Sequence, residues 1–202
     1  HSHIYAEPFL GAERLSDFSM GDIILQAGKP VEGWSPVQLW DGRKGYVPSF
    51  AVADFEKHMS RKHKDLAQDI IECARRFLGS PYLWGGMSAG LFDCSGLVGF
   101  SYYMNGVQLP RDASEQIKCG VPVKFEEMRA GDLVFFGESR VAHVALCTSP
   151  GRIIHSSQIV RENSLVEGAP DYYGRNILDI RRIIGNYSNL SFVRKSSLYF
   201  AD

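Results

Sequence analysis

The stretch GLFDCSGLVGFSYYMNG, residues 90–106, places one cysteine between an aspartate and a serine and then continues with mostly apolar residues. This pattern predicts a helix that begins near Asp93 and ends at Gly106, a common stop signal. Four roles are open for Cys94 at this point: a small buried apolar residue, a metal ligand, a disulfide partner or a nucleophile. The rest of the chain has to distinguish them.

Size and composition limit the possible partners. The chain has 202 residues, of which 45% are hydrophobic and 22% charged, as is ordinary for a globular protein. The net charge of −1 gives no overall attraction to nucleic acid or to an anionic membrane surface. No stretch approaches the roughly 20 apolar residues of a membrane span. We therefore expect no nucleic acid, no membrane span and no cofactor, and a monomeric chain.

The four cysteines are widely spaced, and no two of them form a Cys-x-x-Cys pair. A chain of this size does not need a disulfide scaffold. We expect most of the cysteines to be reduced and buried, which leaves room for one reactive exception. The four are Cys73, Cys94, Cys119 and Cys147.

The N-terminal part of the chain predicts a small β-barrel over residues 1–56. Short alternating segments at 22–27, 34–40 and 44–50 suit strands, and Gly-rich segments between them suit turns. The pattern GDIIL, GWSPV and DGRKGYVP resembles a bacterial SH3-like domain. The charged segment 57–65 predicts a linker. Three aromatic residues are expected in the barrel core: Trp34, Trp40 and Tyr46.

Residues 66–202 predict a second, α+β domain. Leu66, Ile70, Ile71, Ala74, Phe77 and Leu78 recur at helical spacing, and Gly79 follows as a stop. After Gly131 the chain changes to strand-like segments, at 132–137, 142–148, 152–157 and 177–184. Helices followed by adjacent strands indicate helices packed on an antiparallel sheet. The role of the tail, 186–202, stays open.

The chemistry around Cys94 depends on two activators of a thiol. A helix N-terminus and a neighbouring imidazolium both favour the thiolate. Asp93 suits the cap of the predicted helix, so the sulfur would lie in its first turn. The histidines at 143 and 155 lie on successive predicted strands and can be neighbours across the sheet. We therefore expect Cys94 as nucleophile, His143 as base and His155 as the residue that orients the base.

Six ordered blocks strengthen this interpretation: PYLWGG, FDCSGLV, LPRDASEQ, AGDLVFFG, HVAL and IIHSS, within residues 81–157. In this order they resemble the NlpC-type papain-like cysteine peptidases of bacterial cell walls. GMSAGLFDCSG, NGVQLPRDAS and ENSLVEGAPDYYGRNI are similar to the dipeptidyl-peptidase VI-like branch, which joins the peptidase to SH3-like domains. The resemblance implies a papain-like α+β domain behind a small barrel.

The resemblance also implies roles for individual residues. Tyr82 falls on a family tyrosine whose hydroxyl donates to the oxyanion, beside the backbone N–H of Cys94. Asp93, Ser95 and Asp112 match positions that line the substrate groove. Arg111 is instead expected to form a structural ion pair. Trp84 suits a wall of the groove or plain packing equally well.

The branch cleaves between γ-D-glutamate and the next diamino acid, in short peptidoglycan peptides with a free N-terminal L-alanine. A buried ammonium group needs a carboxylate partner, and Glu7 aligns with a family acidic residue at the amine site. At a position after an Asp-Gly turn, the family carries a tyrosine and this chain has Arg43. This difference alters the contacts expected at the amine site. The resemblance implies murein peptide turnover or recycling and leaves the diamino acid open.

Other interpretations remain. A zinc site of Cys94, His143 and His155 is chemically possible, but no further ligand is placed to complete it. Asp132 suits a structural hydrogen-bonding role. A non-catalytic cell-wall-binding module, or an amidase or acyl transferase on the same scaffold, are the alternative functions. The start HSHIYAEPFL shows no signal peptide, so the cytoplasm and, after leader removal, the periplasm or envelope both stay open.

Overall fold

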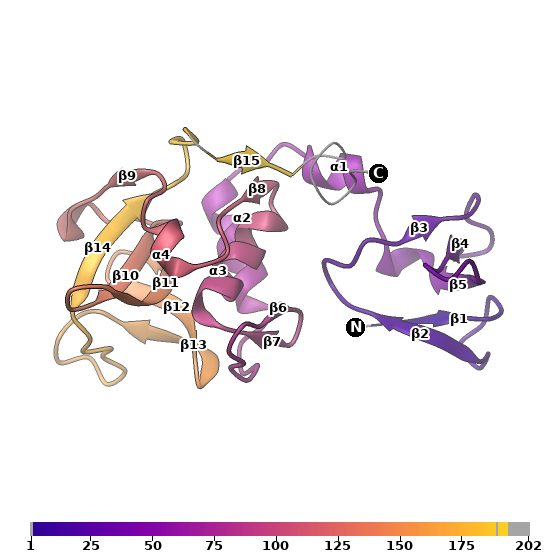
Figure 1. Cartoon of the computed structure of the whole chain (residues 1–202), viewed down its shortest axis with the longest axis horizontal. Coiled ribbons are helices and arrows are strands. Elements are labelled where there is room, and N and C mark those ends of the chain that lie inside the picture. Colours follow the sequence, from indigo (N-terminus) through magenta and orange to yellow (C-terminus); the bar gives the residue numbers. More distant parts are fainter. Residues whose placement is uncertain (1, 189, 194–202) are drawn as a thin grey trace. The chain divides into compact units, whose positions relative to one another are not determined.

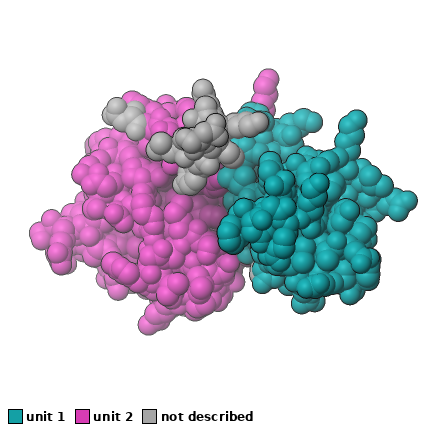
Figure 2. All heavy atoms as spheres, turned by 45° about the vertical axis from the view of Figure 1, so that its right-hand side comes forward, with its two compact units in different colours: residues 1–61 teal, residues 62–202 magenta. Residues whose placement is uncertain are grey.

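The computed structural model of the protein describes residues 2–188 and 190–193. The chain divides into two compact units, residues 1–61 and 62–202, which Figure 2 shows in different colours. The boundary falls inside the segment 57–65 that the sequence predicts as a linker. Within the described part of the chain, no helix is long and apolar enough to cross a membrane.

The first unit is built on a five-stranded antiparallel sheet in the order β2-β1-β5-β4-β3 (Figure 1). The alternating segments predicted three of these strands, but β1 and β2 were not predicted. A short apolar core holds the sheet: Ile4, Phe18, Val37, Leu39 and Val47. The elements are β1 (Ser2–Tyr5), β2 (Arg14–Phe18), β3 (Leu25–Gln26), β4 (Trp34–Gln38), β5 (Lys44–Pro48), a 3-10 turn (Ser49–Ala51) and α1 (Phe55–Met59).

The expected aromatic core of this unit is wrong for Trp40. Its side chain is 97% exposed, because it follows the inward-facing Leu39 and begins the turn at Asp41 and Gly42. Trp34 is half-buried and packs edge-on against Tyr5, with ring centroids 5.6 Å apart. The SH3-like resemblance of the unit stays a prediction.

The second unit combines helices with a six-stranded antiparallel sheet in the order β13-β12-β11-β10-β14-β9 (Figure 1). The expected α+β architecture is confirmed, with β9 and β13 as two additional strands of the sheet. The strands are β9 (Val121–Pro122), β10 (Leu133–Gly137), β11 (Val141–Ser149), β12 (Arg152–Ser157), β13 (Ile159–Ser164) and β14 (Ile177–Arg182). The helices are α2 (Leu66–Arg75), α3 (Cys94–Tyr103) and α4 (Ala113–Gln116), with a 3-10 turn at Phe125–Glu127.

Helix α2 begins where the sequence indicates but ends at Arg75, before the predicted stop at Gly79. Asp65 caps it by accepting a hydrogen bond from the backbone N–H of Gln68. Ile70, Ile71 and Ala74 are fully buried, as an amphipathic stripe requires. Leu78 is the exception to the predicted stripe, since it lies beyond the helix and is 51% exposed.

Helix α3 lies at the centre of the second unit and packs against α2, β11 and β12. Nine of its ten residues are buried, all except Cys94. A helix that is buried all round has no solvent face to guide its orientation, so specific polar contacts fix it. Tyr102 Oη donates to the carbonyl of Gly131 at 2.5 Å, and Ser156 Oγ donates to the carbonyl of Phe92 at 2.8 Å.

The sheet presents both predicted histidines on one face. Side chains alternate along a strand, so His143 and Ala145 of β11 share a face with Ile153 and His155 of β12. An apolar cluster of buried residues covers the same face of the sheet: Met128, Val134, Phe136, Ala145, Cys147, Ile153, Leu165, Tyr173 and Ile180.

Part of the C-terminal tail, whose role the sequence leaves open, pairs with the segment after α3. β15 (Ser191–Phe192) pairs with β8 (Val107–Gln108), and the N–H of Val193 donates to the carbonyl of Gly106. This attaches the tail directly after α3. The remainder of the tail, from residue 194 onward, lies outside the described residues.

The first turn of α3 is tightly packed, which yields a test with a matched control. A Cβ atom added at Gly96 would lie 2.0 Å from the carbonyl oxygen of Gly86, whereas one added at Gly99 would meet Gln116 Nε2 at an ordinary 3.6 Å. Gly96→Ala is expected to lower the free energy of unfolding by about 2 kcal/mol. Gly99→Ala is expected to raise it by up to about 1 kcal/mol, through helix propensity. Urea unfolding of both variants measures this, and equal effects would contradict the packing.

Candidate active site

Cys94 occupies the first position of α3, next to the strand that carries His143. Asp93 caps the helix by accepting from the N–H of Gly96 at 2.6 Å. The Cys94 sulfur accepts a hydrogen bond from the backbone N–H of Val144, the residue that follows His143 on β11. The side chain is half-buried, whereas the other three cysteines are buried. The fold therefore brings the predicted nucleophile beside the predicted base.

The two histidines are hydrogen-bonded to each other, and a third residue continues the chain. His143 Nε2 lies 2.7 Å from His155 Nδ1, and His155 Nε2 lies 2.9 Å from Asn163 Oδ1. Asn163 Nδ2 in turn donates to the carbonyl of Asp171 at 2.7 Å. The predicted neighbourhood of the two histidines is confirmed, and Asn163 is an addition that the sequence did not indicate.

The directions of these hydrogen bonds follow from the backbone carbonyl at the end of the chain. That carbonyl can only accept, so the amide of Asn163 turns its NH₂ toward it and its oxygen toward His155. His155 therefore carries its proton on Nε2 and accepts through Nδ1. His143 must then carry its proton on Nε2. This leaves Nδ1 of His143 as the unprotonated, basic nitrogen for a thiol.

Burial keeps both imidazoles neutral. Burial, followed by the charges of His155 and Arg175, lowers the pKa of His143 from 6.5 to about 3. Burial also lowers the pKa of His155 to about 4, against the opposing effect of the hydrogen bond that His155 donates to Asn163. At neutral pH the pair is uncharged, as the tautomers deduced above require.

At Cys94, burial outweighs the helix N-terminus that the sequence indicates as an activator. Burial raises the pKa of the Cys94 thiol, and the nearby carboxylate of Asp93 raises it further. The N–H groups of Val144 and Ser95 favour the thiolate, as a helix N-terminus should, but they are outweighed. The thiol is therefore protonated at rest, and its proton has to leave as the sulfur attacks.

The expected ion pair of Arg111 is confirmed. Its guanidinium binds both carboxylate oxygens of Asp93, at 3.1 and 2.6 Å, and also the hydroxyl of Ser95 at 3.0 Å. Burial alone would raise the pKa of Asp93, but Arg111 and the N–H groups of Gly96 and Gly85 lower it overall. The side chains of Asp93 and Ser95 are thus buried and held by Arg111 directly beneath the nucleophile.

The remaining predicted site residues differ in how they are held. Tyr82 is half-buried near the sulfur: burial first, and then the charge of Cys94, raises the pKa of its hydroxyl. Asp112 is exposed before α4, and its carboxylate makes no capping bond to that helix. Trp84 is 86% exposed in the loop before α3. Their roles toward a substrate stay predictions.

Glu7 and Arg43 belong to the first unit. Glu7 is exposed, and Arg43 Nε binds the carboxylate of Asp41 at 2.7 Å within its own turn. A role of Glu7 at an amine site stays a prediction.

Tyr173 is a further residue at the site that the sequence did not indicate. Its ring packs edge-on against His155, with centroids 4.5 Å apart, and also contacts the ring of His143. It lies in the loop between β13 and β14, where no periodic pattern marks a buried position. Only its place in the block ENSLVEGAPDYYGRNI could have drawn attention to it.

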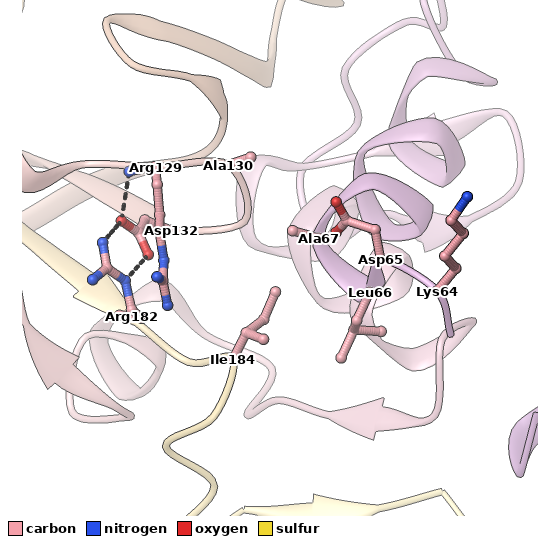
Figure 3. A pocket seen from close by; sticks show the side chains of 9 residues that line it. All are labelled: Lys64, Asp65, Leu66, Ala67, Arg129, Ala130, Asp132, Arg182 and Ile184. Atoms are coloured by element: carbon pink, nitrogen blue, oxygen red, sulfur yellow. Dashed lines mark hydrogen bonds and ion pairs between the residues drawn. The ribbon is translucent and has the colours of Figure 1, made fainter. Parts of the chain in front are cut away.

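A separate pocket on the second unit contains none of these groups (Figure 3). Asp132 and Arg182 point toward each other there, with contacts of 2.9 and 2.8 Å, and Asp132 also accepts from the N–H of Arg129. The expected structural role of Asp132 is confirmed. The lining residues are Lys64, Asp65, Leu66, Ala67, Arg129, Ala130, Asp132, Arg182 and Ile184.

Among residues 2–188 and 190–193, no three His, Cys, Asp or Glu side chains are grouped closely enough to hold a metal ion. In the group around Cys94, Nε2 of His143 and Nδ1 of His155 are hydrogen-bonded to each other, and Nε2 of His155 is hydrogen-bonded to Asn163. The donor set therefore suits proton transfer between neutral groups.

Comparison with known proteins agrees with this geometry. The family model described as NlpC/P60 matches residues 79–182, which include Tyr82, Cys94 and both histidines. The chain belongs to the NlpC/P60 family. The fold of its second unit is accordingly the papain-like α+β fold of that family.

Individual relatives are similar over different lengths. The γ-D-glutamyl-L-lysine dipeptidyl-peptidase of Bacillus subtilis is 38% identical over 125 residues, covering 60% of this chain and 42% of the relative. Dipeptidyl-peptidase 6 of Lysinibacillus sphaericus is 32% identical over 184 residues, covering 84% of this chain and 64% of the relative. A crystal structure of an NlpC/P60 family protein from Bacillus cereus superposes with a TM-score of 0.74 and 28% identity, over 90% of this chain and 60% of that one. The chain thus spans less than two thirds of these proteins.

The buried neutral histidines predict how stability depends on pH. An unfolded histidine titrates near about 6.5, whereas the folded values are about 3 and about 4. Between these limits the unfolded chain binds more protons, so stability falls as the pH falls through this window and is fully present above it. His143→Gln should flatten the slope by about one proton, or about 1.4 kcal/mol per pH unit. Urea unfolding between pH ~4 and ~7 measures both slopes, and identical slopes would contradict burial of a neutral His143.

Proposed function

We propose that the protein is a cysteine peptidase that hydrolyses the γ-D-glutamyl–L-diamino acid bond in short peptidoglycan peptides with a free N-terminal L-alanine. The observation that carries the proposal is the ordered chain of hydrogen bonds from His143 through His155 to Asn163, with His143 on β11, which packs against α3 and its first residue, Cys94. The names of two relatives support the substrate class: one is a γ-D-glutamyl-L-lysine dipeptidyl-peptidase and the other is dipeptidyl-peptidase 6.

The first step is proton transfer coupled to attack. Nδ1 of His143 takes the proton of the Cys94 thiol while the sulfur attacks the γ-carbonyl carbon of the D-glutamate. The carbonyl oxygen becomes an oxyanion, and the backbone N–H of Cys94 and the hydroxyl of Tyr82 donate to it. At rest, the thiol of Cys94 and the imidazole of His143 are both uncharged. Charge therefore develops only when the substrate carbonyl is present to accept it.

The second step returns the proton. The tetrahedral intermediate collapses, the C–N bond breaks, and His143 gives its Nδ1 proton to the departing amine of the diamino acid. A thioester between Cys94 and the γ-carboxyl group remains. Water then attacks this thioester, with His143 as the base again, and releases the dipeptide L-alanyl-D-glutamate and the free thiol.

The His155–Asn163 pair acts as the positioning device of this cycle. His155 Nδ1 accepts the Nε2 proton of His143, so the imidazolium that forms in each step is stabilised by a hydrogen bond that already exists. Asn163 fixes the tautomer of His155 and so keeps Nδ1 as the acceptor. A neutral third residue avoids a permanent negative charge that would hold the proton on His143.

The free amine is best recognised by a carboxylate that is not already held in a structural contact. Asp112 is exposed, and its carboxylate does not cap α4, whereas Asp93 is bound by Arg111. We assign Asp112 to the α-ammonium group of the L-alanine. The requirement for a free amine favours released wall fragments over cross-linked wall, in keeping with turnover or recycling of murein peptides.

The nucleophile is tested by replacement. Cys94→Ala and His143→Gln are each expected to lower kcat/KM for L-Ala-γ-D-Glu-meso-diaminopimelate by at least about 10⁴-fold, because the thioester cannot form or the thiol cannot lose its proton. Product release under reducing conditions, followed by chromatography, measures this. The control is Cys119→Ala, which removes a buried cysteine of α4's C-terminal turn and should retain activity. Hydrolysis by Cys94→Ala, or none by the wild type, would contradict the proposal; binding to peptidoglycan without hydrolysis would favour a binding module.

The amine site is tested with a blocked substrate. N-acetylation of the L-alanine removes the ammonium charge and is expected to lower kcat/KM by about 10- to 100-fold. Asp112→Asn should lower kcat/KM for the free-amine peptide by a similar factor and leave the acetylated peptide nearly unchanged. Equal rates for the two peptides in the wild type would rule out recognition of a free amine.

A further inference from the structure

Two arginines lie close to the histidine pair. Arg161 of β13 lies directly opposite His155 of β12 in the antiparallel register, so both side chains share one face. Arg175, in the loop between β13 and β14, places its guanidinium 5.5 Å from the centre of the Tyr173 ring. That ring packs against both histidines. Both cations therefore lie within one or two side chains of the proposed base.

Neither arginine has the partner that such a cation usually has. In the part of the chain that the structure describes, all ion pairs of arginines involve other residues. The Nε atom of Arg161 is buried and makes no hydrogen bond. A buried donor without a partner costs stability, so Arg161 lacks an acceptor that a ligand could supply. Arg175 is exposed and therefore accessible to an anionic ligand.

The position of these arginines relative to the cleaved bond follows from the proposed function, on which this inference rests. His143 gives its proton to the departing amine, so the leaving group must lie against the imidazole. Tyr82 and Asp112 are assigned to the acyl side of the bond. Arg161 and Arg175 adjoin His155 and Tyr173 instead, and so face the diamino acid rather than the L-alanyl-D-glutamyl part.

We propose that Arg161 and Arg175 form a carboxylate-binding site for the side chain of the diamino acid, which selects diaminopimelate over lysine. The side chain of diaminopimelate ends in both an ammonium and a carboxylate group, and an arginine binds a carboxylate in a planar, two-pronged contact. The side chain of lysine ends in an ammonium group alone, which two nearby guanidinium groups repel. Discrimination thus combines attraction of one substrate with repulsion of the other.

The test compares two peptides that differ only in this side chain: L-Ala-γ-D-Glu-meso-diaminopimelate and L-Ala-γ-D-Glu-L-lysine, each with its C-terminal α-carboxyl group as the amide. The amide removes the α-carboxylate that both diamino acids would otherwise present. The wild type is expected to prefer the diaminopimelate peptide in kcat/KM by about tenfold or more. Arg175→Gln should bring this ratio close to one, and Arg175→Glu should invert it. Arg175→Lys should retain an intermediate preference.

The control is Arg76→Gln, which neutralises an exposed arginine at the C-terminal end of α2 and should keep the wild-type ratio. Only a site that touches the side chain changes the ratio, since a general loss of folding or of catalysis lowers both rates together. If both peptides are cleaved with a ratio near one, or if Arg175→Glu leaves the ratio unchanged, the carboxylate site is refuted while the proposed function stands. If neither peptide is cleaved, the proposed function itself fails.

Discussion

The 2.7 Å hydrogen bond between His143 Nε2 and His155 Nδ1 is the interaction on which the rest of the site depends. Two buried imidazoles can share one proton between facing nitrogens while the pair is neutral or carries a single positive charge, but not when both rings are protonated. The Asn163 amide, oriented by a backbone carbonyl, decides which nitrogen of each ring carries the proton. The unprotonated Nδ1 of His143 and the absence of a resting charge on the pair both follow from that order of donors and acceptors.

The nucleophile is held by an independent set of contacts. Asp93 caps α3 and binds Arg111, while the first turn of the helix lies against the loop at Gly86 with no room for a side chain. The sulfur is therefore fixed from the helix side and the imidazole from the sheet side, and the N–H of Val144 joins the two. Catalytic geometry built on a helix and a sheet in this way does not depend on loop conformation.

Much of this arrangement could be predicted from the sequence, because strong local signals mark it. The apolar run after Cys94, with its cap residue, predicts α3, and the two histidines lie on segments with a clear strand pattern. Asn163 was missed because β13 has the sequence IVRENS, in which polar residues obscure the alternation. Trp40 was misplaced because hydrophobicity alone does not distinguish a turn position from the core. The net direction of the Cys94 pKa could not be predicted, because burial is a tertiary property that outweighed the local effect of the helix N-terminus.

The most direct test of this account is the rate at which iodoacetamide alkylates each cysteine at neutral pH, mapped by mass spectrometry in the wild type and in His143→Gln. The account predicts that Cys94 is modified well before the three buried cysteines, and that its rate falls by at least about tenfold in the variant, since the protonated thiol then has no base. An unchanged Cys94 rate in His143→Gln would contradict the pairing of this sulfur with that imidazole.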